Sequence, residues 1–289
     1  MLKKLIKHEF KATSRFFLPA YGIFAAILVM ERISMMLANS LAENDGFIGV
    51  MSRFFVGVVS FLSVLGVIAM LVSPIIYSIM RFYKNMLCDE GYLSFTLPVT
   101  VSQHLVSKLI VSCVWMIANI FVAVVLGVIF FITVDPTEVG RLFSQFTELL
   151  TTFFEYAGGW LFIAGIMLIL AMLFQLITNY LSFYSAMSIG QCANKNKFLV
   201  SAGVYIAFNI AISTIIQTVV IAMSMVMSKV GFDKINQFFE QINITANAGV
   251  ATCQVMSVVF AGTIVLNILL SVMYFIISKH FLTKKLNLA

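Results

Sequence analysis

Long apolar runs recur along this chain and restrict its fold more than any other feature. Six segments are apolar over a length that can cross a hydrocarbon core of about 30 Å as a helix. We place these spans at residues 17–37, 54–80, 109–134, 160–188, 198–227 and 250–278. Only 10% of the 289 residues are charged, whereas an average soluble domain has about 25%. The sequence therefore predicts an all-α membrane protein with a single transmembrane domain over residues 1–289.

The lysines and arginines are divided unevenly between the two sides of the membrane that the six spans define. Six spans place both termini on one side, and 13 of the 18 lysines and arginines fall there: Lys3, Lys4, Lys7, Lys11, Arg15, Arg81, Lys84, Lys108, Lys195, Lys197, Lys279, Lys284 and Lys285. Short cytoplasmic segments of membrane proteins are enriched in these residues. Both termini are therefore predicted to be cytoplasmic, and the net charge of +6 indicates contact with the lipid bilayer rather than with nucleic acid.

The N-terminal segment, residues 1–16, carries four lysines and a stripe of apolar residues at helical spacing. The apolar stripe consists of Leu2, Leu5, Ile6 and Phe10 and continues to Phe17, one residue beyond the segment. The lysines are Lys3, Lys4, Lys7 and Lys11. This pattern predicts an N-terminal amphipathic helix, residues 1–16, that lies in the cytoplasmic interface with its lysines at the lipid headgroups. The alternative is a disordered basic lead-in.

Two segments on the outer side also repeat apolar residues with helical period. They are residues 136–158, rich in leucine and phenylalanine, and residues 232–244. Both are predicted to be short outer helices on the membrane surface. They either cap a pathway through the membrane or serve as interfacial loop helices.

Catalytic motifs are missing from the sequence. None of the 16 glycines is followed by lysine, so the chain lacks the loop that holds nucleotide phosphates. The His-Glu-x-x-His pattern of zinc proteases and the Gly-x-Ser-x-Gly nucleophile turn are also absent. The four cysteines are scattered without metal-site spacing, and we expect the three histidines, His8, His104 and His280, to be solvated. The chain is therefore predicted not to be an enzyme and to hold no cofactor or metal itself.

Polar residues inside the spans are the first candidates for a pathway, because polar groups in lipid usually face protein or water. Glu31 and Arg32 either line a cavity or already lie at the outer interface. The neutral amides either hydrogen-bond neighbouring helices or bind a substrate, and they are Asn119, Gln175, Asn179, Asn209 and Gln217.

The fifth span has a face of small residues, spaced three or four apart. The stripe consists of Gly203, Ala207, Ala211, Thr214, Thr218 and Ala222. Such faces let helix backbones approach closely. We expect the stripe to pack against another helix, in this chain or in a partner copy.

One stretch between the second and third spans, residues 81–108, is expected to be cytoplasmic and carries the most specific pattern. The sequence RFYKNMLCDEGYLSFTLPVTVSQHLVSKLI, residues 81–110, resembles the first cytoplasmic loop of ABC-2-type transporter permeases, the stand-alone membrane subunits found in Gram-positive bacteria. An acidic residue precedes Gly-Tyr-Leu there, and a Thr-Leu-Pro step and a lysine follow. SAMSIGQCANKNKFLVSAGVY, residues 185–205, is similar to the turn that joins the fourth and fifth spans of the same family.

The resemblance implies partners for this chain. Two membrane subunits, identical or related, would pair with two separate ATPase subunits, which bind ATP and Mg²⁺. The first cytoplasmic loop would form a coupling helix that rests in a groove of the ATPase. The residues assigned to this contact are Asp89, Glu90, Gly91, Tyr92, Leu93, Phe95 and Pro98. The carboxylates would cap the helix or meet basic groups, Tyr92, Leu93 and Phe95 would fill the groove, and Pro98 would end the helix. The alternative is an interfacial loop without a partner.

These observations lead to two hypotheses of different classes. The first is the permease subunit of an ATP-driven exporter in a bacterial plasma membrane, with an amphipathic or hydrophobic peptide as cargo. Its pathway would use parts of spans one, two and five, with Glu31, Arg32, Gly203, Ala207, Ala211, Thr214 and Gln217 as pathway or packing candidates. The second is a non-transporting subunit for peptide sensing or immunity. An ion-coupled carrier ranks last, because the spans hold almost no ionisable residue near mid-membrane.

Overall fold

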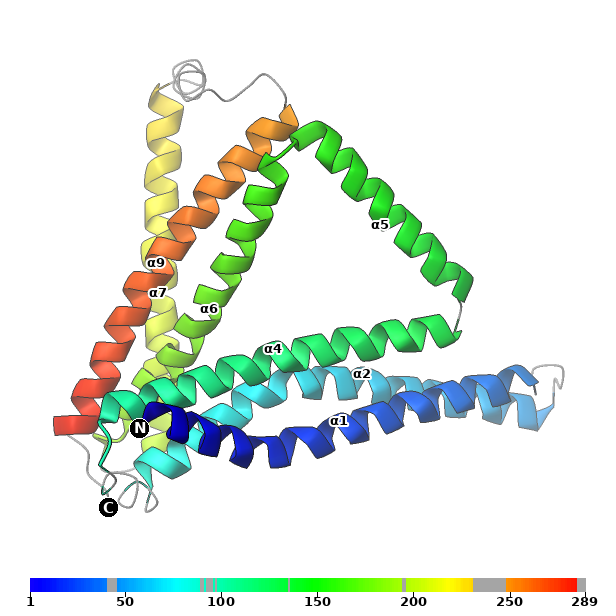
Figure 1. Cartoon of the computed structure of the whole chain (residues 1–289), viewed down its shortest axis with the longest axis horizontal. Coiled ribbons are helices and arrows are strands. Elements are labelled where there is room, and N and C mark those ends of the chain that lie inside the picture. Colours follow the sequence, from blue (N-terminus) through cyan, green and yellow to red (C-terminus); the bar gives the residue numbers. More distant parts are fainter. Residues whose placement is uncertain are drawn as a thin grey trace. The chain divides into compact units, whose positions relative to one another are not determined.

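The regular secondary structure of the described residues is entirely helical. The computed structural model describes residues 1–40, 46–88, 91, 96, 98–134, 136–193, 196–230 and 248–284, and every regular element in these residues is a helix. In chain order they are α1 (Leu2–Ser40), α2 (Phe47–Phe82), the π-helix η1 (Tyr83–Leu87), α4 (Val101–Val134), α5 (Pro136–Ala157), α6 (Trp160–Gly190), α7 (Lys197–Val230) and α9 (Ala248–Lys284) (Figure 1). Six of the described helices are long and apolar enough to cross a membrane, namely α1, α2, α4, α6, α7 and α9. The all-α class and the six apolar helices confirm the sequence prediction, and the side on which the termini lie stays a prediction.

Several helices extend beyond the spans expected from hydropathy. The expected interfacial helix, residues 1–16, and the first span belong to one continuous helix, α1, which contains Pro19. α4 begins at Val101 rather than near residue 109. Its start is fixed by a capping box, because the Gln103 amide donates to Thr100 Oγ1 at 3.4 Å and the Thr100 amide donates to Gln103 Oε1 at 3.2 Å. Polar caps of this kind do not register in a hydropathy average.

The two expected outer helices have different outcomes. α5 (Pro136–Ala157) confirms a helix in the first segment, while its position on the membrane surface stays a prediction. The second segment, residues 232–244, lies outside the described residues.

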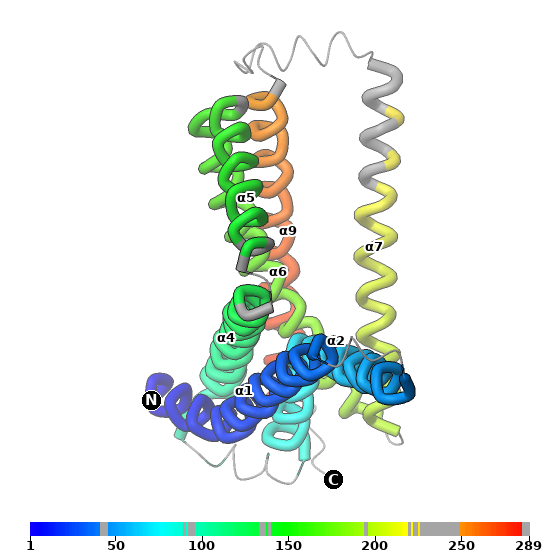
Figure 2. Tube along the Cα trace, turned by 90° about the vertical axis from the view of Figure 1, so that its right-hand side faces the viewer, coloured from blue at the N-terminus to red at the C-terminus, as the bar shows by residue number. Residues whose placement is uncertain are grey.

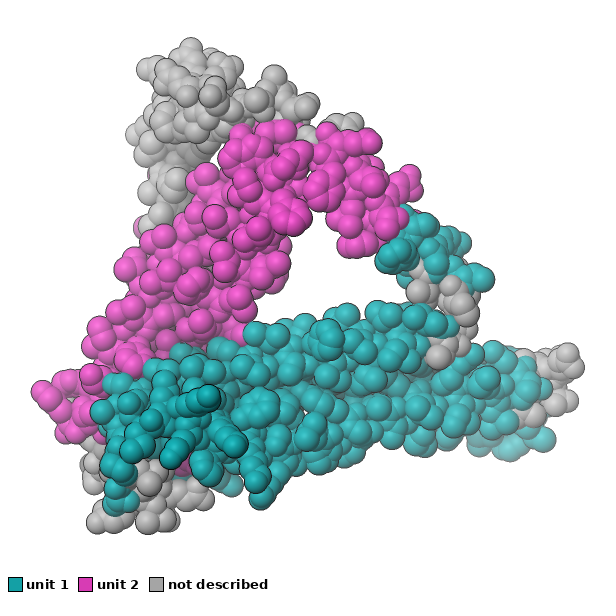
Figure 3. Space-filling model, in the orientation of Figure 1, with its two compact units in different colours: residues 1–84, 95–144 teal, residues 85–94, 145–289 magenta. Residues whose placement is uncertain are grey.

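The chain divides into two compact units, residues 1–84 with 95–144 and residues 85–94 with 145–289 (Figure 3). In the first unit, α1, α2 and α4 lie side by side (Figure 1). Phe17, Val111 and Trp115 form a buried core between them. The Phe17 and Trp115 rings stack with centroids 4.6 Å apart, and Phe16 stacks on Tyr77 of α2 at the same distance. Stacked aromatic pairs add to the burial of their area, so this core joins all three helices.

The second unit is built on the pairing of α6 with α9. α6 buries a small residue at every seventh position, at Ala164, Ala171, Thr178 and Ser185. A seven-residue repeat of small side chains lets two membrane helices run together over many turns. α7 contacts α6 near the turn between them and then separates from α6 and α9 along its length (Figure 2).

Two glycines are required by the backbone of this unit. Gly158, between α5 and α6, has φ of +55°, and its amide donates to the Phe154 carbonyl at 2.9 Å, which ends α5. Gly190 ends α6 where α7 passes closely. A Cβ at Gly190 would overlap Ser201 Oγ and lie 2.8 Å from the Ser201 nitrogen. The turn between α6 and α7 therefore needs glycine at this position.

Candidate functional site

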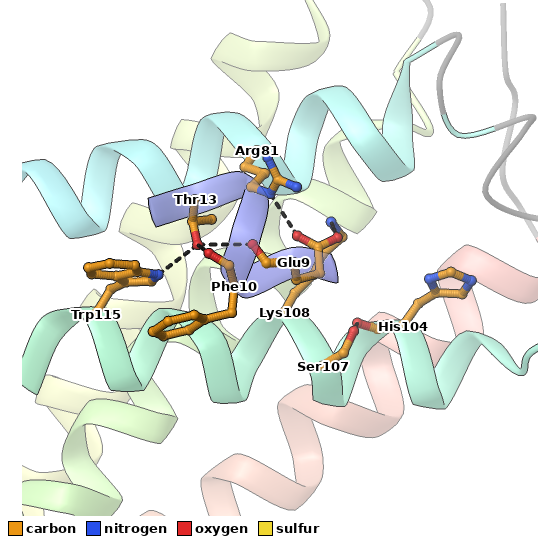
Figure 4. Close-up of polar contacts among 8 residues, drawn as sticks. All are labelled: Glu9, Phe10, Thr13, Arg81, His104, Ser107, Lys108 and Trp115. Atoms are coloured by element: carbon orange, nitrogen blue, oxygen red, sulfur yellow. Dashed lines mark hydrogen bonds and ion pairs between the residues drawn. The ribbon is translucent and has the colours of Figure 1, made fainter. Parts of the chain in front are cut away.

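A carboxylate near the start of α1 joins three helices in the first unit (Figure 4). Glu9 Oε2 lies 2.7 Å from Arg81 Nε on α2, and Glu9 Oε1 lies 2.8 Å from Lys108 Nζ on α4. We call Glu9, Arg81 and Lys108 the Glu9 junction. Each carboxylate oxygen takes one cation, so a single side chain connects α1 to the end of α2 and to the early turns of α4.

The Glu9 junction is largely removed from solvent. The exposed fraction of the side chain is 12% for Glu9, 5% for Lys108 and 22% for Arg81. Ion pairs at this depth are screened far less than surface pairs, and removing one partner from such a pair is strongly destabilising. The two cations exceed the one anion by a single positive charge. Loss of the Glu9 carboxylate would therefore leave two largely buried cations without a counter-charge, which destabilises the junction more than loss of either cation.

A second contact reinforces the junction one turn further along α1. The Thr13 hydroxyl donates to the Glu9 carbonyl at 2.9 Å and accepts a hydrogen bond from Trp115 Nε1 at 2.6 Å (Figure 4). The Phe10 ring stacks on Trp115 with centroids 4.9 Å apart. α1 is thus held to α4 by one ion pair, one buried hydrogen bond and stacked rings.

The junction lies at both stems of the segment that carries the most specific sequence pattern. Arg81 is one residue before the end of α2, and Lys108 lies in the second turn of α4. The π-helix η1 and residues 88–100 connect these two helical ends. Glu9 therefore ties both stems of this segment to each other and to α1.

Most of the expected coupling residues lie outside the described part of the chain. Asp89, Glu90, Tyr92, Leu93 and Phe95 lie outside the described residues. Gly91 is buried, and its amide donates to the Cys88 carbonyl at 2.7 Å. Pro98 is exposed and precedes the start of α4. The coupling helix accordingly stays a prediction.

The charged pair in the first span does not form an ion pair. Within the described residues, Glu31 has no salt bridge to Arg32 or to another cation. Glu31 is 5% exposed, whereas Arg32 lines a pocket of about 220 Å³ between α1 and α4 with Leu126 and Phe130. The two side chains thus have different surroundings on α1.

The small-residue stripe of α7 is exposed. Gly203, Ala207, Ala211, Thr214 and Thr218 are exposed, as is Gln217, and the side chain of Ala222 is outside the described part. A Cβ placed on Gly203 would meet no described atom within 4 Å. Within the described residues, no helix of this chain covers the stripe, so the expected packing inside the chain is not observed.

The neutral amides divide into two groups. Asn119 is buried and donates to the Trp115 carbonyl at 2.7 Å. Gln175, Asn179 and Asn209 are exposed on α6 and α7. Only part of this set can therefore serve helix packing within the chain.

Two features of the site differ from the sequence analysis. Glu9 was not among the candidates, although it falls on the same helical face as Ile6, Thr13 and Phe17. A carboxylate on an apolar face is a signal that a cation will cover it. The expectation that all three histidines are solvated is wrong for His104, which is 4% exposed because α4 begins before it and packs it inward.

No family model matches the sequence, and no curated protein or solved structure is detectably similar to it. The function is therefore argued from the residues of the chain.

Proposed function

We propose that this chain is the membrane-spanning permease subunit of an ATP-binding cassette exporter in a bacterial plasma membrane. Separate ATPase subunits bind ATP and Mg²⁺, and a second permease subunit, identical or related, completes the pathway. The cargo is an amphipathic or hydrophobic peptide or a similar compound. Six long apolar helices and the pattern of residues 81–110 support this proposal.

The Glu9 junction is the observation that carries the proposal furthest. A coupling segment is useful only if its movement reaches the membrane helices instead of being absorbed by a flexible stem. Glu9 holds both stems, through Arg81 at 2.7 Å and Lys108 at 2.8 Å, and it does so from α1. A push on residues 88–100 would thus be delivered to α1, α2 and α4 together. An interfacial loop without a partner has no need of this connection.

The sequence also indicates that the energy source is external. None of its glycines precedes lysine, and the chain carries no other motif for holding nucleotide phosphates. Tyr92, Leu93 and Phe95 provide the apolar contact that an ATPase groove would accept.

The first experiment tests assembly with a candidate ATPase subunit. The Tyr92→Ala plus Leu93→Ala variant is expected to lose co-purification with the ATPase and stimulation of ATP hydrolysis. Phe198→Ala plus Leu199→Ala is the matched control, because these side chains are 64% and 66% exposed near a different predicted cytoplasmic turn. If Tyr92→Ala plus Leu93→Ala assembles with the ATPase as well as the wild type does, these residues do not form the coupling contact.

The second experiment separates export from sensing. Inside-out vesicles that contain the permease and ATPase should accumulate a labelled amphipathic peptide only when ATP is supplied. Peptide binding without ATP-dependent accumulation would instead support a non-transporting sensing or immunity subunit.

A further inference from the structure

A groove with two exposed amide side chains, Gln175 and Asn179, lies between α6 and α9 of the second unit. The two helices run side by side (Figure 1 and Figure 2). The groove has a volume of about 410 Å³ and is lined by the exposed Gln175, Asn179 and Thr263 and by the buried Asn267, among apolar residues. We call it the amide groove. Gln175 is the middle residue of α6, which has 31 residues, and Asn267 is one residue past the middle of α9, which has 37. The amide groove is therefore at mid-membrane depth if both helices span the bilayer.

Three polar groups of the amide groove have no partner among the described residues. Gln175 Nε2 donates to Asn179 Oδ1 at 3.2 Å, which leaves Gln175 Oε1 as an acceptor and Asn179 Nδ2 as a donor. Asn267 Nδ2 donates to the Thr263 carbonyl at 2.9 Å, which leaves Asn267 Oδ1 as a second acceptor. Polar groups without partners in hydrocarbon are costly, so they indicate an occupant.

The contact between α6 and α9 does not need these groups. Thr178 provides the polar link, since its hydroxyl lies 2.9 Å from Ser271 Oγ and 3.1 Å from the Asn267 carbonyl oxygen. Gln175 and Asn179 remain exposed beside this link. Their amides are therefore available to a ligand while the two helices stay together.

The depth and the chemistry of the groove select among occupants. Lipid acyl chains have neither donors nor acceptors, and lipid ester groups lie at the interface. A helix of a second copy has its backbone groups satisfied internally. Of the exposed polar side chains on its α7, Asn209, Thr214 and Thr218 already donate to a carbonyl of their own helix, which leaves Ser213 and Gln217, each a single polar group on a helix surface. An extended peptide brings free N–H and C=O groups together with apolar side chains.

We propose that the amide groove binds an extended segment of an apolar peptide. A peptide C=O accepts from Asn179 Nδ2, and a peptide N–H donates to Gln175 Oε1. The peptide side chains contact Leu168, Met172 and Phe260, which line the same groove. Naming this peptide as the cargo rests on the proposed function, whereas the binding site itself does not.

The test measures binding to the purified full chain in lipid nanodiscs, without ATP or ATPase. The probes are an acetylated, fluorescent Leu-Ala hexapeptide and its depsipeptide analogue, in which backbone esters replace the amide N–H groups. The wild-type chain should bind the peptide about tenfold or more tightly than the depsipeptide, because the donor to Gln175 is lost. Gln175→Met plus Asn179→Leu should lose peptide affinity by a similar factor and no longer distinguish the two probes. Asn209→Leu, an exposed amide on α7 outside the groove, should bind like the wild type.

Equal affinity for both probes on the wild-type chain would overturn the proposal, and this comparison needs no variant to fold. A photo-crosslinker at Met172, which is 62% exposed, identifies the occupant directly. Crosslinks to the peptide support the proposal, and crosslinks that remain on a second copy or on lipid despite saturating peptide contradict it. Peptide binding at the groove without ATP-driven transport would contradict the proposed exporter function but would still support the peptide site in the amide groove.

Discussion

Glu9 Oε1 lies 2.8 Å from Lys108 Nζ, although 99 positions separate the two residues in the chain. Replacing Glu9 with Gln keeps the shape of the side chain and removes its charge. We expect the free energy of unfolding to fall by about 3 kcal/mol, because two largely buried cations lose their common anion. Thermal unfolding in detergent micelles measures this loss.

Lys11→Gln provides the control for that change, since Lys11 is exposed on the same helix and forms no salt bridge in the described part of the chain. Its effect should stay within about 0.5 kcal/mol. A double-mutant cycle of Glu9→Gln and Lys108→Met isolates the pair, and a coupling energy near zero would show that the contact does not hold α1 to α4.

The Thr13 hydroxyl gives a second prediction, because it accepts from the buried indole of Trp115 at 2.6 Å. Thr13→Val preserves the side-chain shape and leaves Trp115 Nε1 without its acceptor. The free energy of unfolding should fall by about 1–2 kcal/mol. Trp115 is one of two tryptophans, so its fluorescence reports the change in a Trp160→Phe background. Thr214→Val is the control, because this exposed hydroxyl donates only to the Ile210 carbonyl. It should change neither the free energy of unfolding nor the Trp115 fluorescence appreciably.

The sequence predicted the class of fold well because one physical cause dominates it. Long apolar helices are the simplest way to satisfy the backbone in lipid, so hydropathy alone indicates six of them. The boundaries are less accurate, since α4 begins at a capping box of Thr100 and Gln103 that adds no hydrophobicity.

The candidate site was harder to predict because it depends on which helix faces are in contact. The distribution of basic residues marks Arg81 and Lys108 only as cytoplasmic charges, and Glu9 was not among the candidates. Their meeting requires that α2 and α4 both pack on the same face of α1, which no local pattern specifies. The stripe from Gly203 to Thr218 shows the converse case, because its composition predicts packing and the described helices leave it exposed.

Gly190 supplies a third prediction, based on the close approach of α6 and α7. A Cβ there would meet Ser201 Oγ and lie 2.9 Å from the Ser201 Cα, and backbone cannot move aside cheaply. Gly190→Ala should therefore lower the free energy of unfolding by about 1–3 kcal/mol. Adding Ser201→Ala should restore only part of the loss, since the backbone contact remains.

Gly203→Ala is the matched control, because a Cβ at that position meets no described atom within 4 Å. It should be neutral or stabilising by up to about 1 kcal/mol through better helix propensity. Equal unfolding temperatures for the two alanine variants would contradict the close contact of α6 with α7.

The link between Thr178 and Ser271 yields the last prediction. Thr178 Oγ1 lies 2.9 Å from Ser271 Oγ and 3.1 Å from the Asn267 carbonyl oxygen, in the most extensive helix pairing of the second unit. Interhelical hydrogen bonds between membrane helices contribute about 0.6 kcal/mol each, since the separated helices find other partners. Thr178→Val and Ser271→Ala should thus each destabilise modestly, and the double variant should lose less than the sum of both. Strict additivity of the unfolding free energies would show that the two hydroxyls do not interact, and Thr178 would then link the two helices through the Asn267 carbonyl oxygen rather than through Ser271.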